Sequence, residues 1–186
     1  WLHKHTALQF HHKNASNTAE PQIWHWQGLD VSWNVKGSSV DSSLAIVLIH
    51  GFGACKEHWR YNQPEIAKVI PCFALDLIGF GDSSQPRARL KGQHKHQGDF
   101  AYNFDNWAQQ VSDFCRVVVQ KKVLLIGNSI GAVIALRSSQ LLQSDCCGVV
   151  LIGCATRALD DKRLTDKPNW MKWSRPLLKK LVSQRW

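Results

Sequence analysis

The stretch that decides the fold is Val123-Leu124-Leu125-Ile126-Gly127-Asn128-Ser129-Ile130-Gly131. Its first four residues form an apolar run of strand length, and the following Ala132-Val133-Ile134-Ala135-Leu136 contains no proline and is rich in Ala, Leu and Ile, as in a helix. A serine on a sharp strand-to-helix turn needs glycines where a Cβ would collide with the strand or the helix. The pattern therefore predicts a nucleophile elbow that presents Ser129 above the edge of a sheet.

Two earlier segments repeat the arrangement of an apolar strand followed by a glycine-rich turn. The first is Leu44-Ala45-Ile46-Val47-Leu48-Ile49, followed by His50-Gly51-Phe52-Gly53, and the second is Pro71-Cys72-Phe73-Ala74-Leu75-Asp76, followed by Leu77-Ile78-Gly79-Phe80-Gly81-Asp82-Ser83. A helix is predicted over residues 104–119 and a later strand over residues 149–153. Strand, glycine turn and helix in this order predict an α/β fold with a mostly parallel sheet flanked by helices. We expect the strands at residues 44–49 and 123–126 to be central in it.

The glycine-rich turn after residues 44–49 can supply what a nucleophilic serine needs. A backbone N–H in such a turn can point at the oxyanion that develops during acyl transfer. The N–H at the start of a helix can do the same. Phe52 N–H and Ile130 N–H are the predicted pair, and Ser129 is the candidate nucleophile.

Three motifs in order along the chain resemble the α/β-hydrolase family. They are HGFG at His50 to Gly53, DLIGFGDS at Asp76 to Ser83, and GNSIG at Gly127 to Gly131, and the resemblance runs from about Trp24 to Cys154. A finer pattern, with W-x-W at Trp24 and Trp26 and HWRYN at His58 to Asn62, is similar to pheophytinase-like and chlorophyll-dephytylating esterases of cyanobacteria and chloroplasts.

The resemblance implies roles for the residues of these motifs. His50 braces the turn in which it lies, and Asp76 hydrogen-bonds the loop backbone rather than orienting a base. The other motif positions expected to be structural are Gly51, Gly53, Gly127, Asn128 and Gly131. A serine at the elbow argues against the haloalkane dehalogenase and epoxide hydrolase branches, which use aspartate there. The resemblance implies no metal and no organic cofactor.

The chain's histidines conflict with the family's catalytic triad. In this family the order along the chain is Ser, then Asp or Glu, then His, yet the last of the nine histidines is His96 and none follows Ser129. Asp160 and Asp161 do follow it, but they also fit an acidic first turn of a helix. One explanation is an N-terminal fragment, with the C-terminal part of the sheet, the catalytic acid and the histidine beyond residue 186. The other is a shortened protein that recruits another base or has abandoned catalysis.

Composition predicts one domain, or most of one, in a reducing compartment. Residues 1–22 are expected to be a poorly ordered polar leader, residues 23–155 the hydrolase core, and residues 156–186 the start of a cap. The six cysteines have no C-x-x-C spacing and read as reduced core thiols, as in a cytoplasmic or plastid-like compartment. The longest apolar runs are strand-sized, so we expect no transmembrane span.

The net charge of +9 is concentrated near the C-terminus. Residues 162–186 contain eight basic residues against Asp166 alone, interleaved with Trp170, Trp173 and several aliphatic residues. Three interpretations stay open. The segment is a cap element, or an interfacial element that lets Trp170 to Trp186 contact a membrane, or a phosphate-binding stretch; no recognised nucleic-acid module accompanies it, and we predict no nucleic-acid partner.

The residues together predict a serine hydrolase that cleaves a carboxylic ester carrying a hydrophobic group. Ser129 would form an acyl-enzyme, and water would then release the acyl group. The predicted partner is a hydrophobic small-molecule ester. The alternative is a non-catalytic, α/β-hydrolase-like binding protein that keeps the pocket and lacks a working base.

Overall fold

The computed structural model describes residues 22–38, 42–88, 94 and 99–154. The predicted cap and, apart from Gln22, the predicted leader lie outside these residues. The elements in chain order are β1 (Gln22–Trp26), β2 (Leu29–Lys36), β3 (Leu44–Ile49), the 3₁₀ turn η1 (Lys56–Trp59), α1 (Asn62–Ile66), β4 (Cys72–Leu75), α2 (Phe104–Phe114), the π-helical turn η2 (Cys115–Val119), β5 (Lys122–Asn128), α3 (Ile130–Leu142), the 3₁₀ turn η3 (Gln143–Asp145) and β6 (Cys146–Ile152).

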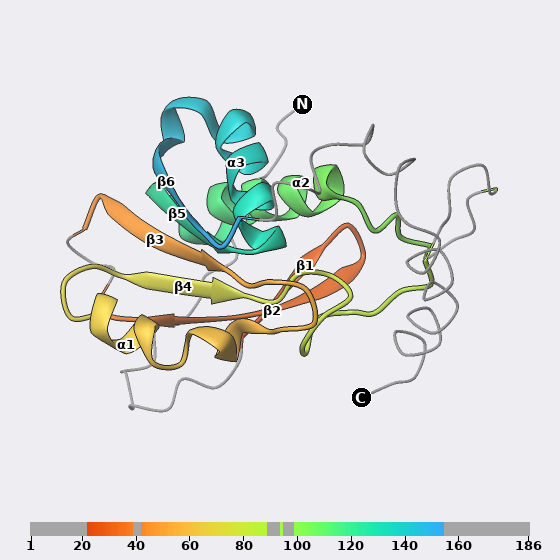
Figure 1. Cartoon of the computed structure of the whole chain (residues 1–186), viewed down its shortest axis with the longest axis horizontal. Coiled ribbons are helices and arrows are strands. Elements are labelled where there is room, and N and C mark those ends of the chain that lie inside the picture. Colours follow the sequence, from red (N-terminus) through yellow and green to blue (C-terminus); the bar gives the residue numbers. More distant parts are fainter. Residues whose placement is uncertain (1–21, 39–41, 89–93, 95–98, 155–186) are drawn as a thin grey trace, which may run out of the picture.

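The strands of the described residues form one mixed sheet in the order β1-β2-β4-β3-β5-β6 (Figure 1). β4, β3, β5 and β6 are parallel, whereas β2 pairs antiparallel with both β1 and β4. β3 and β5 each have a neighbour on both sides, so the prediction that they are central is confirmed. Because parallel strands end at the same edge, the loops after β3, β4 and β5 meet at one place.

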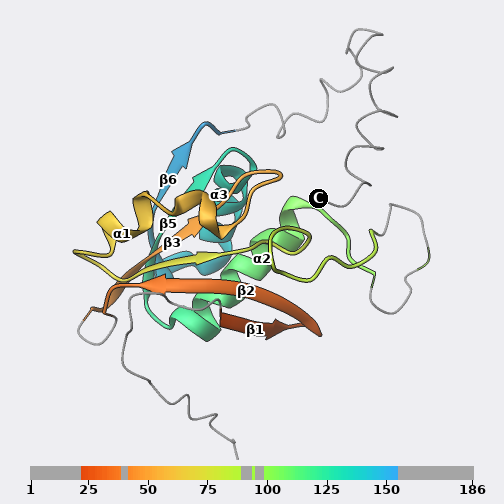
Figure 2. The ribbon, with the colours of Figure 1, turned by 90° about the horizontal axis from the view of Figure 1, so that it is seen from below.

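Helices cover both faces of this sheet. α2 and α3 lie on one face and α1 lies on the other (Figure 1), and Figure 2 shows the same layers from below. Successive side chains of β3 point to opposite faces of the sheet. Ala45, Val47 and Ile49 belong to the core beneath α2 and α3. Ile46 and Leu48 pack with Trp59 on the face toward α1. A strand buried on both faces explains the uninterrupted apolar run in the sequence.

The predicted elements after residue 43 are present with shifted ends. β6 begins at Cys146, three residues before the expected start, and the helix predicted over residues 104–119 is α2 continued by η2. The sequence analysis did not predict the β1–β2 hairpin. The sequence feature that could have indicated this hairpin is Gln27-Gly28 between two tryptophan-containing segments. In the structure these two residues form the turn and both have positive φ (50° and 79°).

The hairpin is fixed by aromatic packing. Trp24 meets Phe114 of α2 with ring centroids 5.7 Å apart, and Trp26 donates its indole N–H to Asp113 at 2.9 Å.

None of the helices within the described ranges is both long and apolar enough to cross a membrane.

Candidate active site

Ser129 lies at the turn between β5 and α3, where the backbone is strained. It is the N-cap of α3 with φ 56° and ψ −115°, a conformation that costs a non-glycine residue on the order of 1–3 kcal/mol. Its N–H donates to Ile152 O of β6 at 2.9 Å. A strained serine held by neighbouring strands is the geometry that the sequence predicts for an elbow.

Close backbone contacts explain the two glycines of the elbow, which we define as residues 127–131. A Cβ on Gly127 would lie 2.1 Å from Gly131 O, and a Cβ on Gly131 would lie 2.4 Å from the carbonyl oxygens of Ile49 and His50. These distances are far inside van der Waals contact. The backbones of β3, β5 and α3 therefore touch directly at this point.

The β3 loop, residues 50–55, packs against the elbow. A Cβ on Gly51 would lie 3.3 Å from Ser129 Cβ, and Ala54 N donates to Gly51 O in a turn at 3.3 Å. Among the described residues, Phe52 N–H has no acceptor. Ile130 is the first residue of α3, so its N–H has no partner within the helix. Both N–H groups predicted for the oxyanion thus remain able to bind a ligand.

His50 is fully buried and both of its ring nitrogens are engaged. Leu77 N donates to Nε2 at 3.0 Å, so the proton is on Nδ1, which donates to Gly51 O at 2.8 Å. Burial lowers the pKa of His50 below its usual value of 6.5. A neutral imidazole that bridges the β3 loop to the residue after Asp76 has no nitrogen left to accept a proton from Ser129.

None of the other histidines of the described ranges is hydrogen-bonded to the serine hydroxyl. His58 Nε2 is 3.4 Å from Asn128 Nδ2, and its ring meets Trp59 edge-on. His25 pairs with Asp30 at 2.6 Å in the β1–β2 hairpin. No histidine in the described part of the chain is hydrogen-bonded to Ser129.

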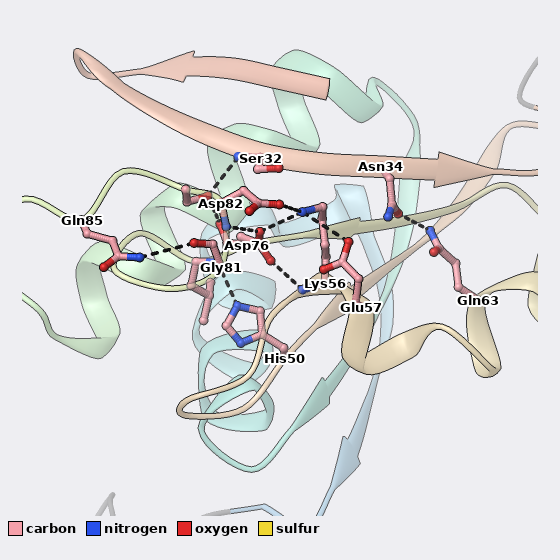
Figure 3. A network of polar contacts seen from close by, with 12 residues as sticks. Ser32, Asn34, His50, Lys56, Glu57, Gln63, Asp76, Gly81, Asp82 and Gln85 are labelled. Carbon is pink, nitrogen blue, oxygen red and sulfur yellow. Dashed lines mark hydrogen bonds and ion pairs between the residues drawn. The ribbon is translucent and has the colours of Figure 1, made fainter. Parts of the chain in front are cut away.

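The β4 loop, residues 76–84, is anchored by Asp76 (Figure 3). Its buried carboxylate accepts from Lys56 N at 2.5 Å and from Asp82 N at 2.9 Å. Lys56 Nζ adds an ion pair to Asp76 at 3.0 Å and another to Asp82 at 2.7 Å. The sequence analysis did not single out Lys56, because its aspartate partners lie 20 and 26 residues further along the chain.

Aromatic side chains line the area between the β3 and β4 loops. Phe52 is 62% exposed, and its ring centroid is 5.5 Å from that of Phe80, which in turn meets Trp107 at 5.9 Å. Such a surface suits an apolar group better than a charged one. It lies on the loops that adjoin Ser129.

A cavity of about 480 Å³ lies at the opposite end of the sheet. It is lined by residues near the amino-terminal ends of β3, β5 and β6, among them Cys115, Arg116, Lys122 and Asp145. Burial raises the pKa of the Cys115 thiol, which keeps it protonated and a poor nucleophile. We therefore place the candidate active site at the elbow and not at this cavity.

The family assignment follows from the fold and the elbow together with a direct sequence match. The sequence model described as the alpha/beta hydrolase fold matches residues 45–175, which is more than half of the chain. The chain belongs to the α/β-hydrolase family. The narrower resemblance to pheophytinase-like esterases stays a prediction.

Curated relatives include both transferases and hydrolases. The chain is 28% identical over 121 residues to the 1-acylglycerol-3-phosphate O-acyltransferase ABHD5 of Sus scrofa, covering 64% of this chain and 32% of that protein. It is 31% identical over 114 residues to the 2-hydroxy-6-oxo-6-(2'-aminophenyl)hexa-2,4-dienoic acid hydrolase of Metapseudomonas resinovorans, covering 59% and 35%. The chain thus spans about a third of the length of these relatives.

Solved structures show the same fold. A membrane phospholipase A described as a bacterial virulence factor superposes with a TM-score of 0.62 at 27% identity, covering 73% of this chain and 40% of that one. The meta-cleavage product hydrolase CumD superposes with a TM-score of 0.60 at 21% identity, covering 72% and 45%. These matches show the α/β-hydrolase fold.

Proposed function

We propose that this chain carries the nucleophile and oxyanion-binding part of a serine hydrolase that cleaves carboxylic esters with a hydrophobic group. The observation that carries the proposal is the strained backbone of Ser129 between two glycines that no larger residue could replace. Strain at a position fixed by three backbone segments is typical of a functional residue. A structural serine at a helix start needs no such conformation.

In the proposed reaction Ser129 Oγ gives its proton to the base and attacks the ester carbonyl, whose oxygen becomes an oxyanion. Phe52 N–H and Ile130 N–H donate to that oxyanion, and the alcohol leaves with a proton delivered by the base. Water then attacks the acyl-enzyme and releases the acid. The base is proposed to be a histidine outside this sequence, because none follows Ser129 and both nitrogens of His50 are already bonded.

Two observations favour an ester with an apolar group. Phe52 and Phe80 form an aromatic surface on the β3 and β4 loops, and the buried Trp107 of α2 packs against Phe80. The names of the porcine acyltransferase and of the phospholipase both denote chemistry on acyl groups bound to oxygen. The hydrolase from Metapseudomonas acts on a dienoic acid, so carbon–carbon hydrolysis is the competing chemistry to be tested.

The test is labelling with a fluorophosphonate probe, followed by turnover of p-nitrophenyl esters of increasing acyl length, in the full-length gene product. Wild type and Ser139→Ala should react alike, since Ser139 lies on the exposed side of α3. Ser129→Ala should lose both labelling and turnover. Equal labelling of Ser129→Ala and wild type would refute the assignment of Ser129 as the nucleophile. Hydrolysis of a carbon–carbon bond in a vinylogous diketone, with no turnover of esters, would refute the assignment of an ester substrate.

A second candidate is a non-catalytic binding protein of the same fold, and it is favoured by His50, whose two ring nitrogens are both bonded and leave no site to accept the Ser129 proton. Residues 1–186 alone should show no more than the activity that an oxyanion site retains without its triad, roughly 10³- to 10⁴-fold above water. Sequencing the gene beyond the codon for Trp186 separates the two. A downstream acid and histidine in family context support the enzyme, and a stop codon at that point supports the binding protein.

Peripheral membrane contact through residues 170–186 is a further part of the proposal, and this segment lies outside the described residues. Its Trp170 and Trp173 would enter the interface while its lysines meet anionic headgroups. Co-sedimentation of the full-length gene product with anionic and neutral liposomes tests this. Binding that is unchanged by Trp170→Ala with Trp173→Ala and by Lys179→Glu with Lys180→Glu would leave the segment as an ordinary cap.

A further inference from the structure

Lys56 is a buried lysine at the start of η1, directly after the β3 loop (Figure 3). Its side chain is 1% exposed, and Nζ lies 3.0 Å from Asp76 Oδ2, 2.7 Å from Asp82 Oδ2 and 3.3 Å from Glu57 Oε1. Burial alone would lower the pKa of this ammonium, but hydrogen bonds to Asp82 and Asp76 outweigh it and raise the pKa. Lys56 is therefore charged inside the protein.

Two of the partners of Lys56, Asp76 and Asp82, belong to a different loop. Asp76 directly follows β4 and Asp82 lies in the turn after it, whereas Lys56 ends the segment that begins at His50. The Asp76 carboxylate also accepts from both Lys56 N and Asp82 N. One lysine thus ties the β3 loop to the β4 loop with its backbone and its side chain together.

The same residues could suggest a metal site, because ligand atoms of Cys55, Glu57 and Asp76 lie within 4.8 Å of one another. The Lys56 ammonium already provides the cation that the Asp76 carboxylate pairs with. Burial also raises the pKa of the Cys55 thiol, which disfavours the thiolate that a metal would need. The cluster is better explained as a lysine-centred ion network.

This network acts on the position of the predicted oxyanion donor. Phe52 lies four residues before Lys56, in the loop whose Gly51 packs against Ser129, and the Ala54 N–H donates to Gly51 O across a turn of that loop. The outer end of the loop is anchored at Lys56 by Asp76. Without that anchor, the segment between Gly51 and Lys56 could shift and carry Phe52 N–H with it.

We infer that Lys56 is a positioning residue that fixes the Phe52 N–H for oxyanion binding by bridging Asp76 and Asp82. This inference rests on the proposed function. It predicts a loss in kcat with little change in KM, since the oxyanion forms in the transition state and not in the bound ester. A misplacement of about 1 Å at such a site can cost on the order of 100-fold in rate.

The experiment compares four variants of the full-length gene product with wild type: Lys56→Met, Lys56→Arg, Asp82→Asn and Lys68→Met. Lys68→Met is the matched control, because Lys68 also pairs with a carboxylate, Glu65 at 2.6 Å, but is exposed and lies far along the chain from the β3 loop. kcat and KM for a p-nitrophenyl ester are measured below each variant's melting temperature. Hydrogen exchange of the peptide covering residues 50–56 is measured in parallel.

Lys56→Met should lower kcat by about 10- to 100-fold with KM within about threefold. Lys56→Arg should recover part of the lost kcat, and Lys68→Met should have the kcat of wild type. Asp82→Asn removes the exposed partner of Lys56 and keeps the ion pair with Asp76, so it should lower kcat by a smaller factor and leave the protein folded. If Lys56→Met does not fold, Asp82→Asn is the variant that tests the inference. Exchange at residues 50–56 should rise in Lys56→Met and stay unchanged in Lys68→Met.

The inference is overturned if folded Lys56→Met, or Asp82→Asn in its place, keeps the wild-type kcat and wild-type exchange at residues 50–56. A change confined to KM also overturns it. If wild type itself has no Ser129-dependent turnover, the proposed function fails instead. The exchange data then still report whether Lys56 orders the β3 loop.

Discussion

The elbow and the β3 loop lie side by side at the edge of the sheet but are held by different forces. The elbow is fixed by backbone contact, with Gly127 and Gly131 admitting no Cβ because carbonyl oxygens fill the space. The β3 loop is fixed by charge, through the buried Lys56 and Asp76 and the exposed Asp82, and by the neutral His50. Steric contact depends on neither pH nor salt, whereas an ion network depends on the protonation of every member. We therefore expect added side-chain volume to destabilise the elbow, and the loss of a charge or a change of pH to destabilise the β3 loop.

The largest effect is expected from Gly127→Ala in the elbow. Its methyl group would lie 2.1 Å from Gly131 O, and neither backbone can move without separating β5 from α3. We expect a loss of more than about 5 kcal/mol in the free energy of unfolding, or no folded protein at all. Urea denaturation followed by circular dichroism measures it. A loss below about 1 kcal/mol would mean that the elbow is softer than the contacts indicate.

The next effect is expected from Lys56→Met in the ion network. Removing one partner leaves the buried Asp76 carboxylate without its cation, which in buried pairs costs about 3–5 kcal/mol. Urea denaturation near neutral pH should show this loss, and Lys68→Met should stay within about 0.5 kcal/mol because its pair is exposed. Equal losses in the two variants would remove the distinction between buried and surface charge.

A smaller effect is expected from Gly53→Ala in the β3 loop. Gly53 has φ +69°, but a Cβ there would meet nothing within 4 Å. Only the left-handed backbone penalises alanine, at about 1–2 kcal/mol. Thermal melts of Gly53→Ala and Gly127→Ala, compared directly, sharpen the contrast. A loss as large as that of Gly127→Ala would show that the loop is also held by steric contact.

The smallest effect is expected from the protonation of His50. Because burial lowers its pKa in the folded state, the unfolded chain binds the proton more tightly, and stability is present above the usual pKa of 6.5 and is lost as pH falls below it. Unfolding free energies between about pH 7.5 and about pH 5 should fall in wild type more steeply than in His50→Gln. Parallel curves would assign the acid sensitivity to other groups.

The sequence predicted the parallel part of the sheet from continuous apolar runs, which are typical of strands buried on both faces. β6 has such a run although its side chains are exposed or half-buried. β3, β4, β5 and β6 were all recognised this way, with ends displaced by up to three residues. The β1–β2 hairpin was missed because β1 has only five residues and because the alternation of apolar and polar residues in β2, from Leu29 to Lys36, was not recognised. The burial of their tryptophans depends on α2, which comes some 70 residues later in the chain.

The sequence predicted those parts of the candidate site that depend on neighbouring residues, and it missed those that depend on distant ones. Ser129, Gly127 and Gly131 stand in one local turn, so their spacing is sufficient to place them together. Lys56 was not predictable, since its partners come 20 and 26 residues later and nothing in a lysine between Cys55 and Glu57 indicates burial. The catalytic roles of Ser129, Phe52 and Ile130 stay predictions until the labelling experiment is done.

What the sequence determined by itself is the order of strands and turns and the serine at their junction, because hydrophobic period and glycine placement are local properties of the chain. What only the tertiary structure decided is how the turns are held. The neutral state of His50 and the charged state of Lys56 each depend on groups that the sheet brings together, Leu77 with Gly51 in one case and Asp76 with Asp82 in the other. Electrostatic energy depends on distance and burial in space, and neither is written in the spacing of residues along a chain.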